Sequence, residues 1–511
     1  MQQVNRVIKN TGILYLKMGI SMFISLYTTR LILNSLGVND FGIFNIVGGA
    51  IAMLSFLNTT MASATQRFMS FANGSGNVEK EKSVFNVSII LHFFIALFLG
   101  IVLIVMGYFF FNGILNISAD RISAAKIVYY FMIVSTMLTI MTVPYDAVLN
   151  ANENMLYFAI VGIVESFLKL AVAFFLFFTT SDKLIVYGML MASISLFIMI
   201  IMRIYCHRKY VECIFAPKKY FDKDLMKEMT SFASWNFLGS ASSMIAGYGS
   251  GIVLNHFHGT LLNAANGIAG QVNGQLLVFS STMQKALNPL IAKSEGEGNR
   301  ELLIKATLSG SKMSFLLFAF FCIPFLIETP YVLKLWLKNV PDWTILFSQL
   351  AVVFTLIEQV SVTLGTAIAA VGNIKKINIY SSLVITLNLA ALIIVFQLGL
   401  PPYYMPILAI VVALFITQIK LYYAKKFCGI TYSVFFKKVF LPIAVVFTLS
   451  LLLGLLPHFF MDSSFIRLML VFLVSSGTYI FVTFIFAFTT SEKRIIQNLT
   501  ESILKKIKSR K

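Results

Sequence analysis

The sequence predicts an all-α polytopic membrane protein with about fourteen transmembrane helices. Hydrophobic residues make up 58% of its 511 residues and charged residues only 12%, whereas a soluble protein carries about 25% charge. Apolar runs of the roughly 20 residues that cross a bilayer recur along the whole chain. The net charge of +19 is then more typical of basic cytoplasmic loops than of nucleic-acid binding.

Polar breaks divide the apolar runs into fourteen predicted spans. The clearest breaks are at 73–77, at 295–299 and at the prolines 401–402. The first run is longer than a signal-peptide core and has no convincing cleavage site, so we expect a retained helix. The predicted spans are 10–36, 41–71, 83–111, 122–147, 155–179, 184–206, 229–257, 261–291, 301–327, 343–371, 376–398, 403–424, 435–457 and 464–489.

The loop charges predict the orientation of these spans. If the N-terminus is cytoplasmic, the cytoplasmic segments hold 28 basic residues and the opposite segments hold 5. Such an excess follows the positive-inside rule. Fourteen spans also return the basic C-terminal tail to the cytoplasm, so we expect both termini there.

Two halves of the chain resemble each other at an offset of about 221 residues. Leu33-Asn34 recurs as Leu254-Asn255, Asn45 as Asn266, and Gly76-Asn77 as Gly298-Asn299. Six spans separate the copies, so the predicted repeats are parallel. The alternative is that apolar helices merely look alike. The predicted parts are a six-helix lobe at 1–206, a cytoplasmic linker at 207–228, a second six-helix lobe at 229–424, two additional helices at 425–489 and a basic tail at 490–511.

Polar residues share one helical face in each of two repeat-related spans. Spacing of about 100° per residue places them within about 60° of each other. This pattern predicts a water-filled cavity whose amides and hydroxyls suit a glycan, although small and polar residues also hold membrane helices together. A hydrophilic drug or metabolite would suit the faces too. The predicted glycan-lining residues are Asn45, Thr59, Ser63, Gln66, Gln271, Gln275 and Thr282.

Basic residues outnumber acids inside the predicted spans. A charge costs at least ~2.5–3.5 kcal/mol at the centre of a membrane helix, so it usually faces water or a partner. The surplus predicts an anionic cargo, and cations of this kind suit a phosphate. Snorkelling to the headgroups is the alternative for those near a span end. The candidates are Lys17, Arg30, Arg67, Lys169, Lys285 and Lys312.

Two acids lie at comparable depth. Glu165 precedes Lys169 by four residues, the spacing of an intrahelical ion pair. Glu358 has no sequence-local partner and shares a face with small residues. Each acid is a candidate for H⁺ or Na⁺ coupling, and each also has a purely structural interpretation.

Enzymatic and metal-binding motifs are missing from the sequence. There is no P-loop, HExxH or GxSxG pattern. The five histidines and four cysteines show no ligand spacing. We therefore expect no catalytic residue, no metal site and no cofactor beyond a coupling ion.

The chain resembles the multidrug/oligosaccharidyl-lipid/polysaccharide flippase superfamily, and most of all its Wzx-type polysaccharide and O-antigen flippases. The resemblance rests on TRLILNSLGVNDFGIFNIVGG at 29–49, TQRF at 65–68 and ALNP at 286–289, together with the fourteen-span plan and the basic tail. It implies two six-helix lobes of the MATE type around a V-shaped cavity, with two further helices beside them. Its recurrent cationic cavity would correspond by position to Lys17, Arg30, Arg67, Lys169 and Lys285.

The resemblance also implies a function. It is the flipping of an undecaprenyl-pyrophosphate-linked oligosaccharide across a bacterial inner membrane by alternating access, for O-antigen or capsule. The implied partners are membrane lipid, a polysaccharide polymerase and chain-length machinery. The alternatives of the same fold are a peptidoglycan-precursor flippase and a cation-coupled drug exporter. A membrane glycan polymerase or ligase is disfavoured because the predicted outer loops are short.

Overall fold

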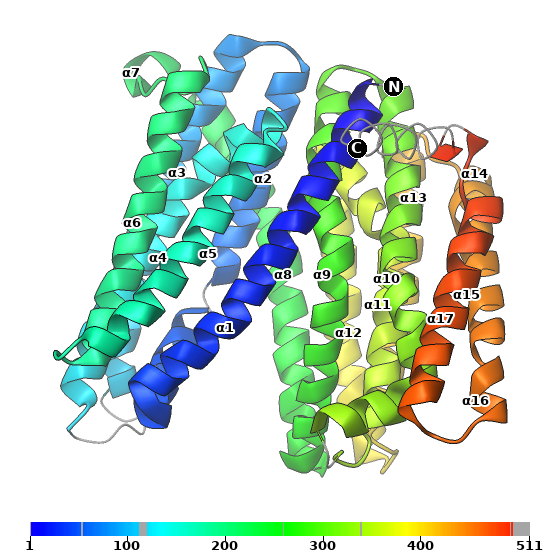
Figure 1. Cartoon of the computed structure of the whole chain (residues 1–511). Coiled ribbons are helices and arrows are strands. Elements are labelled where there is room, and N and C mark those ends of the chain that lie inside the picture. Colours follow the sequence, from blue (N-terminus) through cyan, green and yellow to red (C-terminus); the bar gives the residue numbers. More distant parts are fainter. Residues whose placement is uncertain are drawn as a thin grey trace, which may run out of the picture. The chain divides into compact units, whose positions relative to one another are not determined.

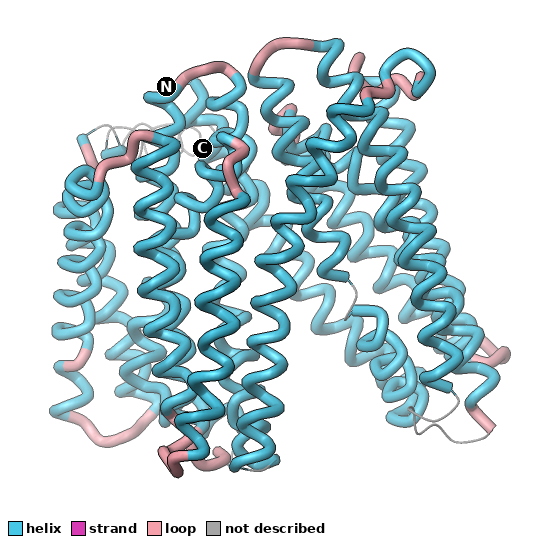
Figure 2. The backbone as a smooth tube through the Cα atoms, turned by 180° about the vertical axis from the view of Figure 1, so that it is seen from behind, coloured by secondary structure: helices cyan, strands magenta, loops and turns pink. Residues whose placement is uncertain are grey.

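The computed structural model describes residues 2–52, 55–111, 120–258, 260–337, 340–490 and 492–493, and within these ranges some helical side chains are not described. In this part of the chain all regular structure is helical (Figure 2). Twelve of its helices are long and apolar enough to cross a membrane by length and composition. The chain is therefore an all-helical, multi-pass membrane protein, as its sequence predicts.

The helices follow one another with short connections (Figure 1). The first eight are α1 (Gln2–Ala52), α2 (Ser55–Gly74), α3 (Val78–Phe109), α4 (Ile122–Ala151), α5 (Met155–Phe178), α6 (Lys183–Lys209), α7 (Pro217–Tyr220) and α8 (Lys223–His258). The next are α9 (Thr260–Gly296), α10 (Arg300–Leu337), α11 (Thr344–Val371), α12 (Lys375–Gln397), α13 (Tyr404–Cys428) and α14 (Tyr432–Phe435). The last are the π-helix η2 (Phe436–Phe440), α15 (Leu441–Gly454), α16 (Leu456–Phe460), α17 (Phe465–Val482) and the π-helix η3 (Thr483–Ala487).

Contacts divide the described residues into two compact units. The N-terminal unit comprises Ile8–Ala241 and Pro289–Asn299, and the C-terminal unit comprises the described residues of Met1–Val7, Ser242–Asn288 and Arg300–Lys511. The boundary falls inside α8 and near the end of α9, rather than in a loop. Asp222 precedes α8 and accepts hydrogen bonds from the amides of Asp224 and Leu225, so it caps α8.

Two predicted spans are absent from the twelve apolar helices. The span at 41–71 corresponds to the part of α1 after its break at Gly37 (φ +77°) together with α2. The span at 261–291 corresponds to α9, whose 37 residues are long enough to cross a bilayer. Both are more polar than the others, and they are the pair that the sequence repeat equates.

The ends of these two helices support the repeat. Gly76 and Gly298 follow α2 and α9 with φ of +67° and +70°, a conformation that glycine adopts without strain. A Cβ on Gly74 would collide with the backbone of Lys293, and one on Gly296 would collide with the carbonyl of Phe71. Each glycine meets the residue that lies three positions before the other glycine. The ends of α2 and α9 therefore cross in a two-fold-like manner within the N-terminal unit.

An ion triad joins three helices of the N-terminal unit. Arg121, directly before α4, donates to Asp40 of α1 at 2.9 Å and to Asp182, the N-cap of α6, at 2.7 Å. Hydrogen bonding from Arg121 holds the pKa of the Asp182 carboxyl below its usual value, although partial burial opposes this. The triad therefore fixes the starts of α4 and α6 against α1.

Packing in each unit separates a core from a lipid-facing surface. In the N-terminal unit, Tyr129 is buried and donates its hydroxyl hydrogen to the carbonyl of Leu103 at 2.6 Å. The opposite face of α3 exposes Phe93, Phe94 and Phe98. Exposed aromatic residues on a membrane helix are expected to contact acyl chains.

The two C-terminal helices pack on α10 in the C-terminal unit (Figure 1). Pro330 removes an amide that would bond to the carbonyl of Leu326, and Gln349 donates to that carbonyl instead at 3.1 Å. Near this break, fully buried Glu328 binds Arg467 of α17 at 2.8 Å. The additional helices are thus attached to α10 by a buried ion pair.

Candidate substrate-binding surfaces

The clearest candidate surface lies on α9. Gln271, Gln275 and Lys285 are exposed there, whereas Thr282 on the same predicted face is buried and donates to the carbonyl of Val278. The glycines at 267, 270 and 274 have open space where a Cβ would lie. No acidic group among the described residues lies within ion-pair distance of Lys285. An exposed amide and ammonium stripe on a membrane helix requires a wet or polar surrounding.

A different face of α9 forms the polar contact with α11. Asn273 donates to Thr355 at 2.8 Å, and Gln284 donates to Gln359 at 2.9 Å. Gln359 also accepts from Ser280. These amides are used in helix packing, which leaves the exposed face of α9 free for another role.

An acid and a base interact between α11 and α13. Glu358 is exposed, and Lys420 lies close enough to interact with it electrostatically. The Lys420 side chain passes 4.0 Å from the position of a Cβ on Gly365, so the small residue leaves room for it. Lys420 is one of the 28 basic residues that predict the cytoplasmic side, although it lies within the predicted span 403–424. It lies inside α13, which continues to Cys428.

Four charged residues gather in the N-terminal unit. Glu165 and Lys169 form the ion pair predicted from their spacing, at 2.6 Å. Lys17 of α1 lies over the ring of Phe158 at 4.1 Å. Asp146 of α4 interacts electrostatically with both Lys17 and Glu165. Two bases therefore face two acids, and this cluster adds no net positive charge when all four are ionised.

Close packing brings Lys17 to this cluster. A Cβ on Gly162 of α5 would collide with the Lys17 side chain, so only glycine allows this approach. Ser166 donates to Ser21 at 3.0 Å one turn further along both helices. The contact between α1 and α5 is therefore built from small and polar side chains around a charge.

Arg67 lies at the end of α2 among aromatic and acidic groups. Its guanidinium is 4.4 Å from the ring centroid of Phe68 and 5.3 Å from that of Phe232. Glu228 lies at 4.0 Å, and Glu295 interacts with it electrostatically. Only 12% of the Arg67 side chain is exposed. This geometry connects α2, α8 and the end of α9 within the N-terminal unit, rather than presenting a free cation.

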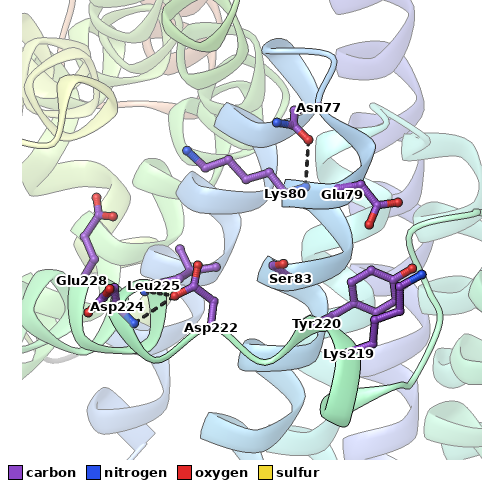
Figure 3. A pocket seen from close by; sticks show the side chains of 10 residues that line it. All are labelled: Asn77, Glu79, Lys80, Ser83, Lys219, Tyr220, Asp222, Asp224, Leu225 and Glu228. Carbon is purple, nitrogen blue, oxygen red and sulfur yellow. Dashed lines mark hydrogen bonds between the residues drawn. The ribbon is translucent and has the colours of Figure 1, made fainter.

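A polar pocket of about 480 Å³ lies beside this contact, between the starts of α3 and α8 (Figure 3). The side chain of Asn77 accepts from the amide of Lys80 and caps α3. Four acidic and two basic side chains line the pocket. They are Glu79, Asp222, Asp224 and Glu228, with Lys80 and Lys219. The lining is net negative, so this pocket does not suit an anionic cargo.

Lys312 is directed toward the C-terminal segment. It is 3% exposed, and its ammonium donates to Glu492 and to the carbonyl of Ala487, both at 2.7 Å. Burial alone would raise the pKa of the Glu492 carboxyl, but the charge and hydrogen bond of Lys312 and the hydrogen bonds from Thr489 together lower it. Lys312 therefore stabilises the attachment of η3 to α10.

The other predicted residues divide between described and undescribed side chains. Ser63 of α2 is exposed and Gln66 is half-buried. The side chains of Arg30, Asn45 and Thr59 lie outside the described residues. The structure thus places the predicted residues in separate groups within each unit. Among those whose side chains are described, only the α9 group is both exposed and cationic.

Sequence reasoning missed Asp146, Lys420, Glu328 and Glu492. Asp146 and Lys420 lie inside the predicted spans 122–147 and 403–424 but within about one turn of their ends, so neither stands out as a charge at depth. Following each helix to its next glycine or asparagine would have placed both further inside. The partners of Glu328 and Glu492 are more than 130 residues away in the chain, and no local pattern points to them.

The sequence matches the family described as "polysaccharide biosynthesis protein" over residues 7–295, more than half of the chain. The chain belongs to this family. The match covers the N-terminal unit except residues 296–299, and it covers α9, which carries the exposed polar stripe, up to residue 295. Comparison with curated proteins gave no significant match.

Solved structures show the fold that this member of the polysaccharide biosynthesis family adopts. A MATE protein in the bent conformation aligns with a TM-score of 0.71 and 14% identity, covering 84% of this chain and 96% of that one. An outward-facing multidrug resistance MATE family transporter of the MOP superfamily aligns with 0.69 and 14%, covering 83% and 95%. The fold is therefore MATE-like.

A MOP superfamily transporter from Pyrococcus furiosus also aligns, with a TM-score of 0.63 and 14% identity over 83% of this chain and 96% of that one. Reverse polarity of that protein's binding pocket is described as suggesting a different function. At such low identity these likenesses concern the fold alone.

Proposed function

We propose that the protein is a flippase for a lipid-linked oligosaccharide. In this proposal it moves an undecaprenyl-pyrophosphate-linked repeat unit from the cytoplasmic to the periplasmic leaflet of a bacterial inner membrane, for O-antigen or capsule. Membership of a polysaccharide biosynthesis family supports a glycan cargo. The MATE-like fold supports alternating access.

The observation that carries the proposal is the exposed stripe on α9. The amides of Gln271 and Gln275 can both donate to and accept from sugar hydroxyls. Lys285, without an acidic partner among the described residues, is suited to a pyrophosphate oxygen. The prenyl chain needs no polar group and remains in the lipid.

The ion pairs in the two units support a coupling role. Glu358 with Lys420, and Glu165 with Asp146 and Lys17, combine acids with bases inside membrane helices. Such groups are rare in membranes because each carries a desolvation penalty, and they often mark ion pathways. H⁺ or Na⁺ uptake by one acid would release its base toward an anionic cargo.

Deletion of the gene tests the function. Lipid-linked repeat units should accumulate in the cytoplasmic leaflet, and surface glycan should disappear. A plasmid copy should restore both, whereas Lys285→Gln should restore neither at equal protein level in the membrane. Normal surface glycan without accumulation in the deletion strain would reject the proposal.

The same strain distinguishes the alternatives. Loss of a peptidoglycan-precursor flippase would cause lysis on depletion, with intact surface glycan on surviving cells. Loss of a drug exporter would increase sensitivity to cationic compounds and leave both glycans intact. A polymerase would leave single repeat units on the periplasmic side of the membrane, where an added glycosidase can reach them.

A further inference from the structure

A second pocket, of about 600 Å³, lies in the C-terminal unit between the start of α10, the segment η2–α15 and the residues after η3. Lys305, Lys437 and Lys438 line it and are exposed. Pro442 and Phe486 provide apolar parts of its wall. The pocket is therefore basic on one side and apolar on another.

Its acidic lining is largely engaged already. Glu492 accepts hydrogen bonds from Lys312 at 2.7 Å, from the Thr489 amide at 2.8 Å and from Ser309 at 3.2 Å. Glu301 is then the one remaining acid among the lining residues, against three exposed lysines. The described lining of the open part of the pocket is thus positively charged, and its acids do not balance most of that charge.

Two π-helices, η2 and η3, border this pocket. η2 contains the adjacent pair Lys437 and Lys438, and η3 ends at Ala487, whose carbonyl accepts from Lys312. π-helical turns are uncommon and occur frequently at functional sites, because they displace backbone groups from the regular ladder. Two of them at one pocket point to a binding role for it.

The surroundings identify the environment of the pocket. Phe436 and Phe440 flank the lysine pair, stack with ring centroids 5.3 Å apart, and are exposed. Leu441 and Phe486 are also exposed. Exposed aromatic residues beside lysines are typical of the boundary between acyl chains and headgroups. A ligand at this position is therefore reached from the bilayer and not only from water.

We infer that this pocket binds an anionic membrane phospholipid. The phosphate diester lies among Lys305, Lys437 and Lys438, and an acyl chain lies along Pro442 and Phe486. Basic pockets between membrane helices on the cytoplasmic side suit acidic headgroups, and the loop charges assign this end of the helices to the cytoplasm. The bound lipid would hold the C-terminal helices against α10, next to the Lys312–Glu492 ion pair.

Binding is measured on the purified full-length protein by native mass spectrometry and by the lipid-dependent rise in Tm. Phosphatidylglycerol should bind and raise the Tm, and phosphatidylcholine should do neither. Each lysine replaced by glutamine should weaken phosphatidylglycerol binding about fivefold. The triple variant Lys305→Gln/Lys437→Gln/Lys438→Gln should lose most of the effect, and the triple Lys→Arg variant should keep it.

The matched control is Lys375→Gln/Lys425→Gln/Lys426→Gln, which removes the same charge outside the pocket and should bind as the wild type does. Equal phosphatidylglycerol affinity in the pocket variant and this control would overturn the inference. Protection by inorganic phosphate as strong as that by the lipid would also overturn it. So would lysine-dependent binding of undecaprenyl pyrophosphate without binding of phosphatidylglycerol, because the pocket would then serve the cargo.

Discussion

Lys285 differs from the other described cations among the six that the sequence predicts to face an anionic cargo. Arg67 lies near Glu228, Lys169 pairs with Glu165, Lys312 pairs with Glu492, and Lys17 lies near Asp146. Four of the six candidate cations thus have an acid nearby. Among the candidates whose side chains are described, only Lys285 has no acid within ion-pair distance.

The roles of Glu358 and Lys420 in transport should depend on each other. Glu358→Gln leaves an ammonium without its partner, and Lys420→Gln leaves a carboxylate without its own, so each change should reduce transport by tenfold or more, corresponding to about 1.4 kcal/mol. The double variant removes both charges. Its loss should therefore be smaller than the product of the two single losses, measured as initial rates in proteoliposomes.

Losses that simply multiply in the double variant would show that the two residues act independently. Thr344→Ala on α11 serves as a control at a buried position away from the pair. It should leave the rate close to that of the wild type.

The Arg121 triad predicts a pH dependence of stability. The Asp182 carboxyl has a lowered pKa in the folded protein because Arg121 donates to it. A carboxyl group whose pKa is lower in the folded state stabilises the fold at pH values above its unfolded-state pKa of about 3.9. This stabilisation is lost as the pH falls through the folded-state pKa. The Tm of the wild type should therefore fall more steeply below pH 4 than that of Asp182→Asn.

At neutral pH the Tm of Asp182→Asn should be lower than that of the wild type by the equivalent of about 1 kcal/mol, and this difference should shrink as the pH falls. Parallel Tm curves for the two proteins from pH 7 to pH 3 would contradict the role of the triad.

At the scale of helices, the sequence predicts most of the spans and several of their ends. Apolar length and loop charge are local properties, so most of the predicted spans coincide with observed helices to within a few residues. Hydropathy does not identify two of the predicted spans as membrane helices, the α1–α2 region and α9. Both carry glycines and amides, which lower the hydropathy and suit a cavity. Partners such as Arg467 for Glu328 depend on tertiary packing, which local patterns do not contain.

The crossing of α2 with the end of α9 predicts a sharp dependence on two glycines. Gly74→Ala or Gly296→Ala places a methyl group against a backbone carbonyl that no rotamer change can move. Each should lower the free energy of unfolding by about 1–3 kcal/mol, seen as a lower Tm and reduced transport.

Gly270→Ala is the matched control, since its Cβ would meet nothing within 4 Å. It replaces glycine by a better helix former and should keep or raise the Tm. A Tm unchanged by Gly74→Ala and Gly296→Ala would mean that the helix ends do not cross closely in the membrane.

At the scale of the whole molecule, the repeat and the loop charges predict the topology. Single cysteines introduced into a cysteine-free variant at Ser75 and Lys376 should react with a membrane-impermeant maleimide only in opened cells. One at Asp120 should react in intact cells whose outer barrier has been permeabilised. Labelling of Ser75 or Lys376 from outside, or protection of Asp120, would contradict the predicted orientation.

The central claim is that a lipid-linked oligosaccharide crosses the membrane along a surface that includes Lys285. It is tested by reconstituting the purified protein in liposomes that carry undecaprenyl-pyrophosphate-linked oligosaccharide in one leaflet and measuring its appearance in the other with an added glycosidase. The wild type and Lys285→Arg should transfer the lipid, and Lys285→Gln should be about tenfold slower or worse, because a charge-assisted contact to pyrophosphate is lost. Transfer by the wild type no faster than in protein-free liposomes, or an unimpaired Lys285→Gln variant, would contradict the account.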